Sequence, residues 1–176
     1  MNHDTQFGQI LDTPIERFFK PLAYSLILLR KQGYPCIFYG DLYGIKGKNP
    51  EPPSCGDKLA DIMLVRTLYA YGEQNDYFEE PSCIGWVRPG TWDKPDGLAC
   101  IMSIAGSGHR RMSVGKEHTG ETWTDVLEWE QGKVQIDEEG YGLFHCPPKG
   151  VAIWVNSTAR ERHRFPLNFN SDIYRK

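Results

Sequence analysis

From about Asn75 onward the chain changes from helix-like to strand-like patterning, and this change constrains the fold more than any other feature. Before it, apolar residues recur at three- and four-residue spacing, which is typical of amphipathic helices. After it, short β-rich runs alternate with clusters of Gly, Pro and Asp; the runs are residues 83–88, 98–105, 111–114, 122–126, 133–136, 142–146 and 151–156. Short strands at near-regular spacing predict an antiparallel β-sandwich, large enough for a core of its own.

The part before this change indicates α/β architecture. A helix is expected over residues 13–32, with Thr13 as N-cap, Gly33 as C-terminal cap and a bend at Pro21. The apolar run Cys36–Tyr39 suits a strand buried on both faces of a parallel sheet.

An exposed loop over residues 44–56, rich in Gly, Pro, Lys and Asn, should follow that strand. A second helix is expected over residues 58–71, capped by Asp57 and closed by Gly72. The chain therefore divides into 1–74 (α/β), 75–156 (all-β) and a tail over 157–176, which we expect to be extended or disordered because it is basic and has few periodic apolar residues.

Composition narrows the class of protein. A formal net charge of −3 gives no sign of the basic surface that nucleic-acid binding requires. The sequence also has no run of about 18 apolar residues that could span a membrane. The five cysteines are an odd number without a C-x-x-C pair, which argues against a disulfide framework and a zinc ribbon. With no apolar segment of a signal peptide in the first residues, a cytoplasmic protein with reduced thiols is expected. The oligomeric state stays open.

Several motifs together resemble one enzyme family. Asn2-His3-Asp4-Thr5 resembles the last of the short motifs that identify α-amylases of glycoside hydrolase family thirteen. The stretches 20–24, 28–30, 33–44, 69–78, 97–99, 120–123 and 140–144 continue the match in the same order and spacing. The likeness is to the liquefying and cytoplasmic bacterial α-amylases and the similar fungal intracellular enzymes, and it runs from residue 2 to about residue 155.

The resemblance implies a fold and a partial active site. The chain would hold the C-terminal end of a (β/α)8 TIM barrel, as helix–strand–helix, followed by the family's β-sandwich. Members of the family hydrolyse internal α-1,4-glucosidic bonds of starch or glycogen with retention, so an α-glucan is the implied partner. By the same resemblance, Asp4 is the carboxylate that stabilises the transition state, and His3 binds sugar hydroxyls.

Two of the family's three carboxylates have no counterpart in this chain. Retaining hydrolysis needs a nucleophile and a general acid, which in the family come from strands four and five, and no segment here resembles either motif. Asp12, Glu16, Asp41 and Glu51 are candidates only by being acidic, and they are better interpreted as caps, solvated charges or loop residues. We therefore expect a C-terminal fragment that is inactive alone, with Met1 an internal methionine of a longer product; whether the chain itself counts as an enzyme stays open.

Further binding residues are implied less directly. Tyr43 lies in the loop after the expected strand, on the catalytic side, and is a candidate for substrate binding. Asn75-Asp76 resembles the junction where related amylases bind calcium, so Asp76, with Asp93 as a second oxygen donor, is a candidate metal ligand. Trp86 and Trp154 are predicted to be core residues.

Two other functions are compatible with the pattern. A non-catalytic glucan-binding or interaction module would present exposed aromatic residues from a stable sandwich. A His-Asp metal phosphohydrolase would need further ligands at helical spacing, which the remaining histidines do not provide.

Overall fold

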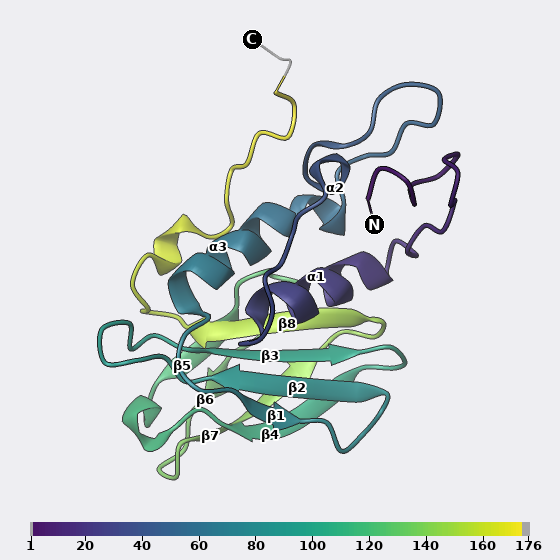
Figure 1. Ribbon diagram of the computed structural model, residues 1–176. Coiled ribbons are helices and arrows are strands. Elements are labelled where there is room, and N and C mark those ends of the chain that lie inside the picture. Colours follow the sequence, from purple (N-terminus) through teal and green to yellow (C-terminus); the bar gives the residue numbers. More distant parts are fainter. Residues whose placement is uncertain (1, 174–176) are drawn as a thin grey trace.

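The computed structural model describes residues 2–173 as three layers. Helices α1 (Phe19–Leu29) and α3 (Leu59–Tyr69) lie over one face of a six-stranded antiparallel sheet, and a two-stranded sheet covers the other face (Figure 1). The N-terminal segment and the short helix α2 (Tyr39–Tyr43) lie above the helices in that view.

The strands follow the sequence pattern closely. The larger sheet has the order β1-β2-β3-β8-β5-β6, and β4 pairs with β7 in the smaller one. Their bounds are β1 Asn75–Tyr77, β2 Cys83–Arg88, β3 Leu98–Ser103, β4 Gly108–Ser113, β5 Thr122–Asp125, β6 Val134–Gln135, β7 Tyr141–Cys146 and β8 Gly150–Asn156. Each predicted run overlaps a strand, although β4 begins three residues earlier than predicted, and β1 was not predicted. A C-terminal β-sandwich fits this arrangement.

Two cores lie on opposite faces of the large sheet. Trp86, Cys100 and Ile153 face the helices, while Val87 and Trp154 face the small sheet. Successive residues of a strand point to opposite faces, so strands in the middle of three layers are apolar without interruption. The prediction that Trp86 and Trp154 are core residues is confirmed, since they are 0% and 1% exposed.

Helix α1 is shorter than predicted. It begins at Phe19 instead of after Thr13, and no side chain caps its N-terminus. Residues 10–14 are exposed, and without packed neighbours a short helical segment gains too little to form. Pro21 consequently lies in the first turn, where the missing N–H costs no helical hydrogen bond, so the expected bend has no cause. The helix ends at Leu29, and Gly33, with φ +94°, lies in the turn beyond it.

The predicted strand Cys36–Tyr39 is not present. Residues 34–38 are irregular, and α2 begins at Tyr39. Phe38 has extended dihedral angles, but among the described residues no neighbouring strand pairs with this run. A strand requires a hydrogen-bonding neighbour, so the apolar run alone does not form one.

The second helix agrees better with expectation. α3 spans Leu59–Tyr69, within the predicted range 58–71, and buries Leu59, Ile62 and Val65. Its N-cap is Lys58 rather than Asp57, which has φ +64° in the short 3₁₀ helix η1 (Cys55–Asp57). The preceding loop, expected to be exposed, is exposed at residues 46–48, half-buried at several other positions, and buries Ser54 and Cys55 at its end.

The segment after Ser157 is more ordered than expected. Ala159 and Phe165 are buried in the core under the helices, and η3 (Arg162–Arg164) lies between them. The Leu167 N–H donates to Asp61 Oδ1 at 2.8 Å, and Tyr69 donates to the Arg160 carbonyl at 2.7 Å. Two apolar anchors and these hydrogen bonds are therefore enough to hold residues 159–167 against α3. A further short 3₁₀ helix, η2 (Lys116–His118), precedes β5.

No helix within residues 2–173 has the length and apolar character needed to cross a membrane.

Candidate functional site

His3 and Asp4 occupy a tight turn built by the residues on either side of them. The Asn2 side-chain oxygen accepts hydrogen bonds from the N–H groups of Asp4 and Thr5 at 2.9 and 3.1 Å. The Thr5 hydroxyl accepts from the Asn2 N–H at 2.9 Å. Asn and Thr at these positions thus satisfy the backbone of the turn and leave the two residues between them free to point outward.

The pair is presented to solvent. His3 Nε2 lies 3.3 Å from Asp4 Oδ1, and their side chains are 82% and 54% exposed. An imidazole beside a carboxylate can bind sugar hydroxyls, and the carboxylate can stabilise a developing positive charge. The structure brings these two predicted residues together, whereas Asp12 and Glu16 are exposed elsewhere on the same segment.

Sequence reasoning missed a buried ionic cluster around Lys20 of α1. Lys20 Nζ is 2.9 Å from Asp41 Oδ1 and 3.3 Å from Glu51 Oε2. Ser54 Oγ donates to Asp41 Oδ1 at 2.6 Å, and Tyr24 donates to Asp41 Oδ2 at 2.6 Å. Asp41 was interpreted as a cap, a solvated charge or a loop residue, but it lies in α2, is 1% exposed and pairs with Lys20. The available signal was Lys20 itself, which the helical spacing places on the buried side of α1.

This cluster joins four parts of the chain. It connects α1, α2, the exposed loop and η1, because its members come from each of them or stand directly beside them. Burial, followed by the hydrogen bond to Asp41, raises the pKa of Tyr24, and burial raises the pKa of Cys55 to about 12.

Tyr43, the candidate substrate-binding residue, lies on the same short helix as Asp41. Its ring lies 4.6 Å from that of Tyr39 and 5.7 Å from that of Phe169. Tyr43 is therefore anchored by aromatic contacts and not directed toward the His3–Asp4 turn by any of these contacts.

Asp76 is engaged by neighbours that compete with a metal ion. Its Oδ2 lies 3.6 Å from Arg30 Nη2, and its Oδ1 accepts from Gln74 Nε2 at 2.6 Å. Asp93 accepts from the Thr91 hydroxyl in a different loop. Within residues 2–173 no group of three or more His, Cys, Asp and Glu side chains gathers as a metal site. Calcium requires six to eight oxygens, so the described residues do not fit it as they stand.

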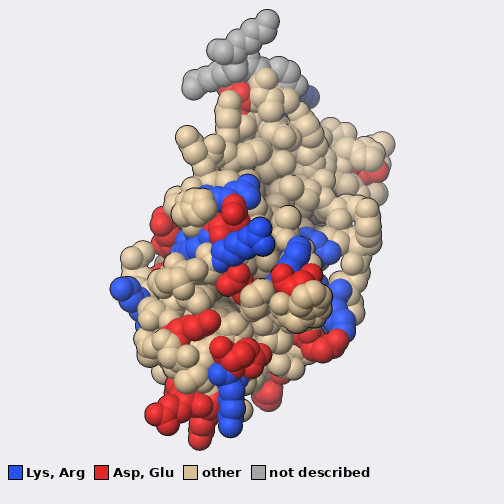
Figure 2. Space-filling model, turned by 90° about the vertical axis from the view of Figure 1, so that its left-hand side faces the viewer, with Lys and Arg blue, Asp and Glu red and all other residues tan. Residues whose placement is uncertain are grey.

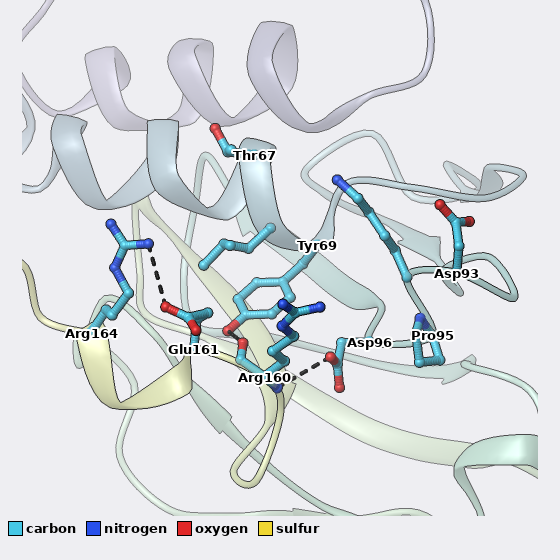
Figure 3. A pocket seen from close by; sticks show the side chains of 10 residues that line it. Thr67, Tyr69, Asp93, Pro95, Asp96, Arg160, Glu161 and Arg164 are labelled. Carbon is cyan, nitrogen blue, oxygen red and sulfur yellow. Dashed lines mark hydrogen bonds and ion pairs between the residues drawn. The ribbon is translucent and has the colours of Figure 1, made fainter.

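Asp93 instead lines a cavity of about 620 Å³ that the sequence did not predict. Figure 3 shows it between the end of α3, the loop 93–96 and the segment 160–164. Two of its carboxylates have partners: Glu161 lies 3.6 Å from Arg164, and Asp96 accepts from the backbone N–H of Arg160 at 3.1 Å. Charges of both signs are also interleaved over the sandwich end of the molecule in Figure 2. No local motif signals this cavity, because its walls come from segments far apart in the sequence.

Comparison with known proteins shows what the chain is similar to. No family model matches the chain. Over 156 residues, 88% of the chain, it is 44% identical to an α-amylase of Bacillus licheniformis. Over 162 residues it is 38% identical to a cytoplasmic α-amylase of Escherichia coli (strain K12), again covering 88% of the chain. The resemblance to α-amylases is confirmed.

The match covers only part of these α-amylases. The chain spans about 30% of the length of the Bacillus licheniformis relative and 32% of that of Escherichia coli. A glucan 1,4-alpha-maltohexaosidase of Bacillus sp. (strain 707) is also 44% identical over 30% of its length. The chain thus corresponds to a part of an α-amylase-like protein.

A solved structure supports the fold alone. The crystal structure of a γ-CGTase from alkalophilic Bacillus clarkii superposes with a TM-score of 0.58 at 18% identity. It covers 89% of this chain and 25% of the γ-CGTase chain.

Proposed function

We propose that this chain serves as the C-terminal portion of an α-amylase-like glycoside hydrolase that acts on α-1,4-glucans such as starch or glycogen. The observation that carries the proposal is 38–44% identity to α-amylases over 88% of the chain. In this proposal residues 1–74 are the end of a catalytic (β/α)8 barrel, residues 75–156 are the β-sandwich domain, and residues 157–176 are a C-terminal tail. The E. coli relative and the free thiols favour a cytoplasmic location.

Exposed apolar side chains on residues 7–39 support the barrel assignment. Ile10 and Tyr34 are each 95% exposed, and Phe7, Leu11 and Ile27 are 56%, 57% and 43% exposed. A concentration of exposed apolar residues marks a surface that packs against something else. In the proposed arrangement they pack against the remainder of the barrel, and the run Cys36–Tyr39 gains the strand neighbours that it lacks here.

Within that arrangement Asp4 is the transition-state-stabilising carboxylate and His3 binds the sugar at the cleavage point. Both lie on an exposed turn, so they are accessible to substrate. A nucleophile and a general acid must come from other segments, because retention requires two carboxylates about 5–5.5 Å apart. We therefore propose that residues 1–176 alone do not hydrolyse starch.

A chimera tests the assignment. In the Bacillus licheniformis α-amylase, the segment aligned with this chain is replaced by it, and reducing-sugar release from soluble starch is measured for a chimera that melts cooperatively. Asp4→Asn should lower kcat by roughly 100-fold or more, because charge stabilisation in the transition state is lost. His3→Ala should raise KM and lower kcat/KM, and Asp12→Asn, the matched exposed control, should change neither. Full activity of the Asp4→Asn chimera would contradict the proposal that Asp4 stabilises the transition state.

A non-catalytic glucan-binding module is the alternative, and one observation favours it. Trp92 is 95% exposed in the loop that also carries Asp93 of the cavity, and an exposed indole face suits the apolar face of a pyranose. Retention of residues 1–176 on insoluble starch, lost in Trp92→Ala and retained in Trp129→Ala, would support this function.

Calcium binding at Asp76 remains a prediction of the resemblance. If the complete arrangement adds the missing oxygens and displaces Arg30, calcium should raise the Tm of the chimera, and Asp76→Ala should reduce that rise. A calcium response in Asp76→Ala equal to that of the unmutated chimera would mean that the ion binds elsewhere.

A further inference from the structure

Two buried cysteines from different sheets border one small space. Cys83 begins β2 of the large sheet, Cys146 ends β7 of the small sheet, and they are 4% and 0% exposed. Gly108 of β4 is the register partner of Cys146. A Cβ placed on Gly108 would lie 2.4 Å from Cys83 Sγ and 3.0 Å from Cys146 Sγ. The absence of a side chain on Gly108 is therefore what lets the two sulfurs approach each other.

The two thiols are in direct contact. The two side chains interact by a hydrogen bond that lowers the pKa of Cys83 and raises that of Cys146. Burial, the largest influence, raises the pKa of both thiols. The Arg110 guanidinium, which donates to the Cys83 carbonyl at 2.6 and 2.9 Å, favours the Cys83 thiolate, whereas Glu80 opposes it. Cys83 is thus the sulfur better placed to react first.

The other cysteines are differently placed. Cys100 and Cys55 belong to the core under the helices, on the opposite face of the large sheet from Cys83 and Cys146. Cys36 is exposed. The structure accordingly gives Cys83 one thiol partner in its own core.

We propose that Cys83 and Cys146 are an oxidation site, which closes to an inter-sheet disulfide when the protein meets hydrogen peroxide. The Cys83 thiolate attacks one peroxide oxygen, the O–O bond breaks, and Cys83 sulfenic acid and hydroxide form. Cys146 sulfur then attacks the Cys83 sulfur, its proton leaves with the departing hydroxyl as water, and the S–S bond forms. Overall, two thiols are oxidised and one peroxide is reduced to two waters. This site does not depend on the glucanase proposal.

The cross-link would tie the two layers together at their common end. The chain passes from the large sheet to the small one between β3 and β4, beside Cys83 and Gly108. A disulfide here restricts the unfolded chain over the long loop between residues 83 and 146, and such a restriction stabilises a fold. Oxidised protein should therefore melt at higher temperature, by roughly 5–10 °C.

Mass spectrometry tests the site on the full chain. After millimolar hydrogen peroxide at mildly alkaline pH, the intact protein should be lighter by two hydrogens, and alkylation in denaturant without reduction should leave Cys83 and Cys146 unalkylated. Proteolysis should then give one cross-linked peptide pair containing Cys83 and Cys146, together with the higher Tm, and both should revert with dithiothreitol. Cys83→Ser and Cys146→Ser should each abolish the cross-link, whereas Cys36→Ser, the exposed control, should retain it.

The peptide map of the unmutated protein decides the case even if a serine variant fails to fold. Full alkylation of Cys83 and Cys146 after peroxide, oxidation to higher acids without a cross-link, or pairing with another cysteine would each overturn the proposal.

Discussion

Lys20 shows how much one buried side chain can determine locally. Its ammonium group lies among Asp41, Glu51 and Ser54, and it is 5% exposed. A buried charge is costly to desolvate and becomes tolerable only when it is paired and hydrogen-bonded. The helix that carries Lys20 and the loop that carries Glu51 are consequently held in one relative position, and α2 is held with them.

Replacing Lys20 by an uncharged residue should therefore strongly destabilise the fold. Lys20→Met leaves Asp41 buried without its counter-charge, and we expect the free energy of unfolding to fall by about 3–5 kcal/mol. Urea unfolding followed by circular dichroism measures this change. Lys31→Met is the matched control, since Lys31 pairs with Glu73 at the exposed surface. A loss as small for Lys20→Met as for Lys31→Met would show that the cluster is not stabilising.

The pairings of Lys20 also show what single-residue reasoning cannot predict. The turn chemistry of Asn2 and Thr5, the core positions of Trp86 and Trp154, and the strand runs all follow from local pattern, because they depend on neighbours in the sequence. The partners of Lys20 lie 21, 31 and 34 residues away. The cavity walls, the thiol pair and Asp61's contact with the tail are equally non-local, so no pattern within a window of sequence could have shown them.

Among the elements, α3 depends on a carboxylate near its N-terminus. Asp61 is 1% exposed, accepts the Leu167 N–H and lies 3.9 Å from Lys58 Nζ. Burial raises the pKa of Asp61 more than the Leu167 hydrogen bond and Lys58 lower it. The folded protein therefore retains the Asp61 proton to higher pH than the unfolded chain does.

This difference gives a pH dependence with a definite sign. As pH rises from about 4, the ordinary pKa of an aspartate, the unfolded chain releases the proton first, so stability is lost until the folded pKa is passed. Asp61→Asn retains an oxygen for the Leu167 N–H and has no proton to lose. Its stability relative to the unmutated protein should therefore increase with pH over this interval, as measured by urea unfolding at a series of pH values. A constant difference would contradict the raised pKa.

Some segments differ from the sequence-based expectation because they have fewer or more packing partners in the fold than their local pattern suggests. Residues 13–18 do not join α1, because all of them except Ile15 are exposed and gain little from packing, and Cys36–Tyr39 forms no strand because no described strand pairs with it. Residues 159–167 are ordered because α3 offers them a surface. Periodicity predicts which face an element would bury, but only the rest of the molecule determines whether there is something to bury it against.

At the scale of the whole molecule, the large sheet separates two hydrophobic cores and contributes one face to each of them. Trp86, Leu98 and Ile153 belong to the core that α1 and α3 complete, so the sandwich residues supply only part of that core. A protein limited to residues 75–156 would expose this face to water, although its length alone suggested a core of its own.

We accordingly expect residues 75–156 alone to bind a hydrophobic dye and to melt at lower temperature and less cooperatively than residues 1–176. Calorimetry and dye fluorescence on the two proteins measure this. An equally sharp transition without dye binding in residues 75–156 would show that the sandwich is independent of the helices.

The order β1-β2-β3-β8-β5-β6 has a consequence for synthesis on the ribosome. The central pairing joins β3 to β8, which is almost the last regular element to be translated. Until residue 156 has emerged from the exit tunnel, β3 has an open edge and α1 and α3 have only part of the surface that they cover. Contacts of such large sequence separation form slowly, and the nascent chain remains exposed to aggregation while they are missing. The final strand therefore sets the moment at which the whole chain can become stable, and a pause in translation before β8 would prolong the most vulnerable stage of its folding.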